Sequence, residues 1–239
     1  MRLLRKIPAL LLALTWVSCS HYYLPANRLE TPEAAGVGRT ARLELVGIQG
    51  GSDLQAPPLY IMPGAGSTAA PTPVLQAANA NYFFGFAPAI TDKIDVGVRF
   101  QPSAPLLIRG KYQLYGQPEI KADKGNLAAA IMASGGLTLG GRDASTGNSV
   151  SFTSFDIALL GGYRVWKNHL FSIGPAYALG SLSGTSPSGI SANQLEVNLG
   201  YQYSNESLFL RGEIAWASGS SGQNKITGFF PGALLGFSF

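Results

Sequence analysis

The side chains from Thr40 to the C-terminus alternate between apolar residues and small or polar ones, and this alternation limits the possible folds more than any other feature. In residues 194–203, for example, every odd-numbered side chain is Leu, Val or Tyr, and every even-numbered one is Gln, Glu, Asn or Gly. A period of two places successive side chains on opposite faces of a β-strand. The sequence therefore predicts an all-β protein.

The same pattern recurs in a series of segments separated by turn-forming residues. Ten of these are predicted to be strands, at residues 41–49, 79–90, 94–101, 106–115, 126–140, 151–166, 170–180, 194–203, 208–216 and 226–239. Most have the length, about 9–11 residues, that a tilted strand needs to cross a bilayer. Short connections (91–92, 167–168, 205–206) and longer ones rich in Gly, Ser, Pro and Asn (50–78, 141–150, 185–192, 220–225) divide between two rims. This division is typical of a transmembrane β-barrel.

Two connections depart from the pattern. Residues 102–105 are short on the side of the long loops, and residues 116–125 are long on the side of the short turns. An eight-stranded barrel, with one of these hairpins misassigned, is therefore an alternative to ten strands. We predict a closed antiparallel transmembrane up-and-down β-barrel over residues 39–239.

The composition bears on the soluble alternatives, a β-sandwich or a lipocalin-like barrel. Only 13% of the residues are charged, about half the usual share of a soluble domain. The outer face of a soluble sheet normally carries many Lys and Glu side chains, whereas the non-apolar face here is mainly Gly, Ala, Ser, Asn and Gln. This face suits a confined lumen. A helical membrane protein is excluded, because no apolar run near 20 residues follows the N-terminal segment.

The N-terminal segment, residues 1–19, has the features of a secretory signal peptide. Three basic residues within the first six precede an apolar stretch, Ile7–Val17, that is too short to span a bilayer. Its end, "WVSC", resembles the lipobox of bacterial lipoproteins, which implies lipidation of Cys19. Ordinary signal-peptidase cleavage near this position is the alternative. Residues 20–38 show no period and are predicted to form a periplasmic tether.

Several of these features together resemble small Gram-negative outer-membrane β-barrel proteins. They are the signal peptide, the ten alternating segments, "TDKIDVGVRF" at residues 91–100 and the terminal "GALLGFSF" at residues 232–239. The resemblance implies that Phe239, Phe237 and Leu235 form the signal read by the barrel-assembly machinery. It also implies contact with outer-membrane lipid, a periplasmic position for the short turns and the tether, and extracellular long loops. Members of this family include anchors, pores, adhesins and enzymes, so the resemblance leaves the activity open.

The inward face of the predicted barrel carries six basic and five acidic side chains. They are Arg42, Glu44, Asp95, Arg99, Arg109, Lys111, Asp156, Arg164, Glu196, Arg211 and Glu213. Because an unpaired charge in a narrow interior is costly, near-balance predicts ion pairs that fill the lumen. The predicted role is then structural or one of surface interaction. The alternative is a narrow diffusion or transport channel lined by Arg99, Arg109 and Lys111.

Other functions find little support in the sequence. The two histidines, His21 and His169, lie in the tether and in a tight turn, so we expect no enzyme, no cofactor and no metal site. Without the three basic residues of the signal, 14 basic side chains (17 minus 3) face 13 acidic ones, and a nucleic-acid partner has no electrostatic basis. The apolar stretch Leu59–Met62 is a candidate partner site. The alternatives are a lid over the barrel mouth or a segment that enters the lipid headgroups. No surface partner can be named from the sequence.

Overall fold

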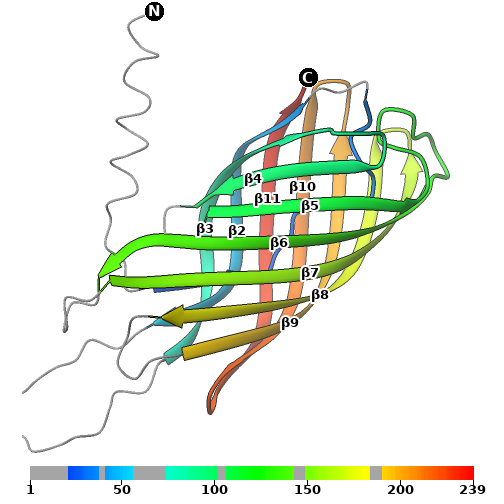
Figure 1. The fold of residues 1–239 in the computed structure, drawn as a ribbon. Coiled ribbons are helices and arrows are strands. Elements are labelled where there is room, and N and C mark those ends of the chain that lie inside the picture. Colours follow the sequence, from blue (N-terminus) through cyan, green and yellow to red (C-terminus); the bar gives the residue numbers. More distant parts are fainter. Residues whose placement is uncertain (1–20, 38–40, 56–73, 102–105, 143–148, 184–189) are drawn as a thin grey trace, which may run out of the picture.

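The computed structural model describes residues 21–37, 41–55, 74–101, 106–142, 149–183 and 190–239. All of its regular elements are strands (Figure 1). The strands are β1 (His21–Pro25), β2 (Ala41–Gln55), β3 (Val74–Pro88), β4 (Ile94–Phe100), β5 (Leu106–Tyr115), β6 (Leu127–Arg142), β7 (Ser149–Trp166), β8 (His169–Ser183), β9 (Ile190–Ser204), β10 (Leu208–Ser221) and β11 (Asn224–Ser238). No helix within the described ranges is long and apolar enough to cross a membrane.

The strands from β2 to β11 form a closed wall. Each pairs antiparallel with its neighbours in sequence, and β11 pairs with β2 to close the ring. At this seam Phe237 lies opposite Leu208 on one side and Leu43 on the other. The prediction of a closed antiparallel barrel with ten wall strands is thus confirmed, and the eight-stranded alternative is wrong.

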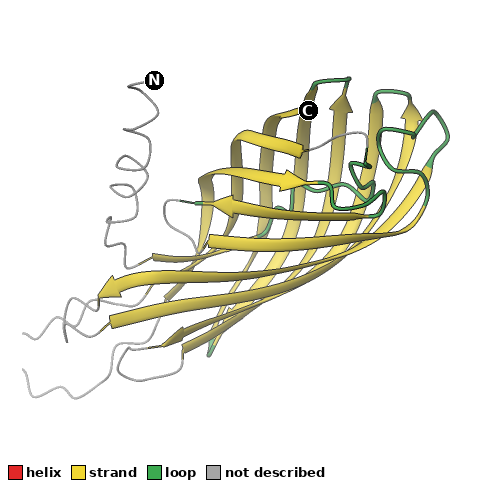
Figure 2. Ribbon diagram, turned by 45° about the horizontal axis from the view of Figure 1, so that its top comes forward, coloured by secondary structure: helices red, strands yellow, loops and turns green. Residues whose placement is uncertain are grey.

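The two ends of the barrel differ, and we name them by their residues. The turn rim holds the connections 89–93, 116–126, 167–168 and 205–207 together with the C-terminal Phe239, and these connections are green near the C label in Figure 2. The loop rim, at the opposite end, holds the strand ends at Gln55 and Val74 and the turn at 222–223. Both β2 and β3 extend further toward the loop rim than predicted, because their hydrogen-bonded ladder continues to the pair formed by Gln55 and Val74. The apolar stretch Leu59–Met62 lies outside the described residues.

The structure explains the two connections that broke the predicted pattern. The connection 102–105 is short because β4 is short: its last residue, Phe100, pairs with Phe84 in the half of β3 nearer the turn rim. The connection 116–126 is long because it folds onto the barrel interior, where the Glu119 amide donates to the carbonyl of Ala34. Neither departure changes the number of strands.

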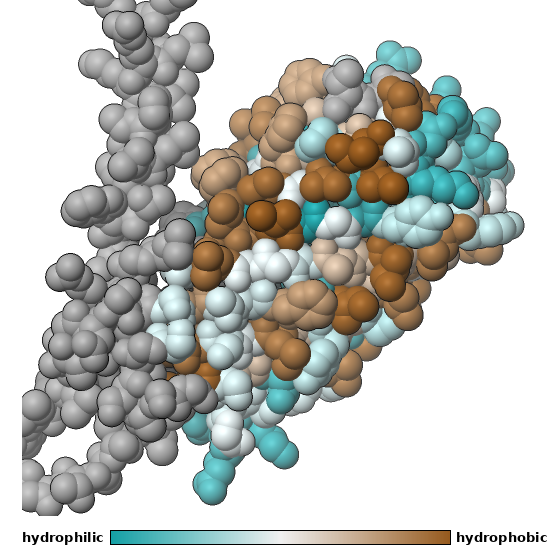
Figure 3. Space-filling view, in the orientation of Figure 1, coloured by the Kyte–Doolittle hydropathy of each residue, from teal (hydrophilic) through white to brown (hydrophobic). Residues whose placement is uncertain are grey.

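Apolar side chains cover the outside of the wall. In β5 the burial alternates strictly over residues 106–114, with Leu106, Ile108, Tyr112 and Leu114 exposed. Figure 3 shows such residues as brown patches over the middle of the barrel. An exposed apolar band on a closed barrel, with polar groups inside, is the arrangement that a lipid bilayer requires.

The predicted tether does not lie outside the barrel. Every residue from 22 to 36 is buried, and β1 pairs with β2 rather than ending at a rim. This burial could not be predicted from the sequence, because the segment is irregular after Pro25 and the surrounding wall is what buries it. The predicted boundary between a tether at 20–38 and a barrel at 39–239 therefore does not separate two packed units.

Candidate functional site: a lumen filled by the N-terminal segment

The most unusual part of the molecule is the segment 21–37, which we call the plug. Its first part, β1, runs antiparallel to the loop-rim end of β2, with His21 opposite Gln55 and Pro25 opposite Gly51. The seam strand β11 pairs with β2 only as far as Ile48. β1 therefore takes the edge of β2 where β11 leaves it. The Ala26 amide, which donates to the carbonyl of Gly50 at 2.8 Å, continues this pairing inward.

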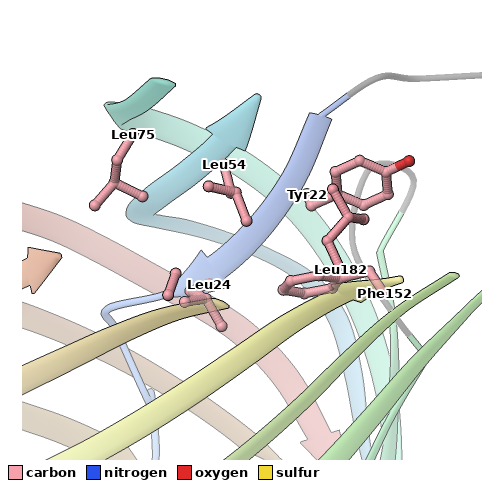
Figure 4. Packing of buried hydrophobic residues seen from close by; sticks show 7 residues of the cluster. Tyr22, Leu24, Leu54, Leu75, Phe152 and Leu182 are labelled. Atoms are coloured by element: carbon pink, nitrogen blue, oxygen red, sulfur yellow. The ribbon is translucent and has the colours of Figure 1, made fainter. Parts of the chain in front are cut away.

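The part of the plug at the loop rim, β1, is anchored by apolar packing. Tyr22 and Leu24 of β1 contact Leu54 of β2, Leu75 of β3, Phe152 of β7 and Leu182 of β8 (Figure 4). The rings of Tyr22 and Phe152 lie 5.5 Å apart. These buried side chains come from β2 and β3 and from β7 and β8, so this cluster holds β1 against the inner face of the wall near the loop rim.

Arg28, further along the plug, faces an acidic part of the wall. Its guanidinium lies 2.5 Å from a carboxylate oxygen of Glu196 on β9 and 3.3 Å from one of Asp156 on β7. All three side chains are buried. A buried charge is tolerated only where partners surround it. The acidic wall residues therefore fix the depth at which Arg28 sits.

The backbone beside Arg28 binds a third carboxylate. Leu29 has a φ of +50°, in the left-handed region that costs a residue with a Cβ about 1–2 kcal/mol. This turn directs the amides of Arg28 and Leu29 to the same side, and they donate to the two oxygens of Glu213 at 2.6 and 2.8 Å. Successive amides in such a turn form an anion-binding nest. The Leu29 side chain, also buried, packs against Phe83, Phe209 and Leu234.

Glu30 faces the basic part of the wall. Four cationic groups lie near its carboxylate, those of Arg99 (3.4 Å), Arg109 (2.7 Å), Lys111 (3.5 Å) and Arg211 (3.7 Å). The same residues bind plug carbonyls: Arg99 donates to Arg28, Arg211 to Leu29, and Lys111 to Thr31 and Glu33. The plug thus supplies both a carboxylate and a series of carbonyl acceptors to these cations.

The C-terminal part of the plug, from Glu33 to Val37, reaches the turn rim. The carboxylate of Glu33 accepts hydrogen bonds from Arg164 of β7, including one of 3.1 Å from its Nε, and one of 2.8 Å from the side-chain Nδ2 of Asn126. The Ala34 amide donates to Gln113 of β5 at 2.7 Å. At the end of the plug, the Val37 amide donates to Asp92 at 2.9 Å.

Asp92, which is half-buried, links the end of the plug to the connections at the turn rim. A hydrogen bond from Lys121 of the connection 116–126, together with the bond from the Val37 amide, lowers the pKa of this carboxyl below its ordinary value. Both bonds favour the ionised carboxylate, since each donor binds the charged form. Asp92 therefore joins the plug and two connections at the turn rim.

The structure places the eleven predicted lumen charges on the buried face of the wall. Some pair with one another: Glu44 binds Arg99 and Arg109, and Asp95 binds Arg42 and Lys111. The others are completed by residues that the sequence interpretation missed. These are Arg28, Glu30 and Glu33 of the plug and Glu119 of the connection 116–126, which binds Arg42 and Gln202.

Other predicted residues lie elsewhere. Phe237 and Leu235 are in β11 at the seam, half-buried on its outer side, and Phe239 is exposed at the turn rim, where its amide donates to Ala41. His169 begins β8, and its Nδ1 lies 2.7 Å from the hydroxyl of Tyr201. Cys19 and the signal peptide, residues 1–19, lie outside the described residues.

Small cavities lie beside the plug. Two cavities of about 10 Å³ lie beside it, one lined by Glu30, Arg109 and Arg211 and one by Arg28 and Arg99. A volume of this size holds about one water molecule. Among the described residues, no group of three or more His, Cys, Asp or Glu side chains is placed to hold a metal ion.

The fold and its filled lumen define a class: a closed ten-stranded antiparallel β-barrel of the outer-membrane type. No protein-family model and no curated protein matches the chain. A solved structure with a similar fold is the outer membrane protease OmpT from Escherichia coli, with 10% sequence identity and a TM-score of 0.38, over 84% of this chain and 94% of that one.

This match corrects one prediction. The sequence led us to expect no enzyme, but the matched barrel is a protease, so that expectation is withdrawn. At this identity and TM-score the likeness does not assign an activity to any residue of this chain.

Proposed function

We propose that this protein is an outer-membrane barrel that is sealed by its own N-terminal plug and has a structural or surface-interaction role. One observation carries the proposal: residues 22–36 are all buried inside the wall, and their three charged side chains are paired with it. Removing the plug would leave buried cations and carboxylates without partners, which is costly in a narrow interior. The plug is thus part of the stable barrel.

The same contacts argue against the alternative of an open channel. Arg99, Arg109 and Lys111, which would line such a channel, each contact the carboxylate of Glu30. The cavities beside them admit about one water molecule. An ion could pass only after the plug had moved.

Planar-bilayer recording tests the proposal. We expect the purified full-length barrel to show no stable conductance, and a variant lacking residues 21–37 to conduct. Heat-dependent migration on a gel reports whether each variant has folded. Stable currents through the folded full-length protein would refute the proposed seal.

A second variant covers the case in which the deleted chain does not fold. A specific protease site inserted between Gly38 and Thr40 lets the barrel assemble with its plug and be cleaved afterwards. We expect cleavage followed by mild denaturant to release the plug and open a conductance. The uncleaved variant under the same denaturant is the matched control. If the cleaved barrel is freed of its plug and still does not conduct, the proposal fails.

A further inference from the structure

We propose that the mature chain is threaded through its own barrel, so that the residues preceding His21 lie on the membrane side of the long loops, opposite the C-terminus. The inference rests on the plug described above but goes beyond sealing, because a plug entering from either end would seal the lumen. It also reverses the predicted arrangement, in which the N-terminal flank lies on the side of the short turns.

The direction follows from the order of contacts along the plug. His21 pairs with Gln55, the last residue of β2 at the loop rim. Ala26 reaches Gly50, Ala34 reaches Gln113, and Val37 reaches Asp92 in a connection of the turn rim. The plug therefore passes from the loop rim to the turn rim, and β2 then returns along the wall.

Chain length prevents the flank from returning to the turn rim within a few residues. An extended chain advances at most about 3.3–3.6 Å per residue, so the two residues that separate Cys19 from His21 in the sequence can span no more than about 7 Å. The hydrocarbon core of a bilayer is about 30 Å thick. A mature chain that begins at Cys19 therefore has its N-terminus at the loop rim. An acyl group on Cys19 would enter the leaflet at that rim.

The charges of the plug fix this register. Arg28 lies against the acidic residues Asp156 and Glu196, and Glu30 lies against the basic group of β4, β5 and β10. A shift of two residues along the lumen would bring Glu30 to the acidic residues. Like charges in a buried site repel, and each loses its partner. The complementary pattern therefore holds one direction and one depth.

The position of β1 ties threading to barrel closure. β1 occupies the edge of β2 next to the seam, where β11 separates from β2. Once the seam is closed, passage through the filled lumen would require carrying Arg28, Glu30 and Glu33 past their wall partners. Threading therefore precedes or accompanies the pairing of β11 with β2.

Cysteine labelling of intact cells with a membrane-impermeant maleimide tests the topology. The probe is Ser20→Cys, the loop-side reference is Ser145→Cys, and the turn-side reference is Lys124→Cys. The unaltered chain, with Cys19 alone, gives the background. We expect Ser20→Cys to react as Ser145→Cys does and unlike Lys124→Cys. A Ser20→Cys probe that reacts like Lys124→Cys would overturn the inference.

A disulfide tests the direction inside the barrel, whichever membrane face the loops occupy. Leu24 pairs with Ser52, so the double variant Leu24→Cys/Ser52→Cys should cross-link on oxidation. Leu24→Cys/Ser238→Cys, which joins the plug to the turn-rim end of β11, should not. Cross-linking of the second pair and not the first would reverse the direction. Neither result depends on conductance, so a barrel that conducts with its plug present would refute the seal without refuting the threading.

Discussion

Replacement of Glu30 by Gln tests how the plug is held. The amide keeps the shape of the side chain but removes the negative charge that faces Arg99, Arg109, Lys111 and Arg211. The substitution acts on the docked state, because only there does the Glu30 carboxylate lie beside these cations. The change should therefore shift the balance between the docked and undocked plug and leave the wall intact.

The size of the shift follows from the partners that remain. Breaking a buried ion pair by removing one partner costs about 3–5 kcal/mol. Glu44 still binds Arg99 and Arg109, and Asp95 still binds Lys111, whereas the ion pair of Arg211 is lost. We therefore expect the lower end of the range, about 3 kcal/mol, which raises the ratio of undocked to docked plug roughly 150-fold.

The open probability in planar bilayers measures this ratio. Openings of the size seen in the plug-deleted barrel should become about two orders of magnitude more frequent in Glu30→Gln than in the full-length protein. Glu206→Gln, in an exposed turn, is the matched control and should leave the frequency unchanged. If the plug-deleted barrel conducts but Glu30→Gln opens no more often than the control, Glu30 does not hold the plug.

Three further variants test other parts of the structure. Asp92 has a lowered folded-state pKa, so the stability that it gives to the docked plug is present above the ordinary carboxyl pKa and is lost as the pH falls through the folded value. The protection of the Val37 amide against hydrogen exchange, relative to the intrinsic rate at each pH, should fall over that acidic range, and Asp92→Asn should abolish this dependence. Gly47→Ala places a Cβ inside the ring of a neighbouring phenylalanine and should destabilise the barrel in denaturant by about 1–3 kcal/mol, whereas Gly110→Ala, which meets nothing within 4 Å, should be neutral; equal losses would contradict the packing. Leu159→Arg on the exposed face of β7 should cost about 2–4 kcal/mol of folding free energy in lipid vesicles, and Tyr163→Arg nearer the turn rim about 0–1 kcal/mol, so the absence of any depth dependence would contradict a membrane-spanning wall.

The wall strands could be predicted because their pattern is local. Successive side chains of a strand face lipid and lumen in turn, so the alternation of Leu195 to Tyr203 already separates the two faces. The loop-rim ends of β2 and β3 could not be predicted. Their ladder continues beyond the alternating segments 41–49 and 79–90, and its backbone hydrogen bonds need no periodic side chains.

The plug could not be predicted for a different reason. Arg28, Glu30 and Glu33 stand in an irregular segment with Pro25 and Pro32, and such a segment reads as a linker. Their burial depends on wall residues up to 185 positions away in sequence, as in the bond between the Arg28 amide and Glu213. Near-balance of the wall charges gave no hint that a further segment would share their pairing.

The sequence by itself therefore determined the strand period, the closed seam at Phe237 and which side chains face the lumen, because these depend on neighbours along one strand. Only the tertiary structure decided that residues 21–37 fill that lumen and that they run from the loop rim to the turn rim. The physical reason is that the energy of a buried charge depends on which partners the closed wall brings around it, and that arrangement exists only in three dimensions.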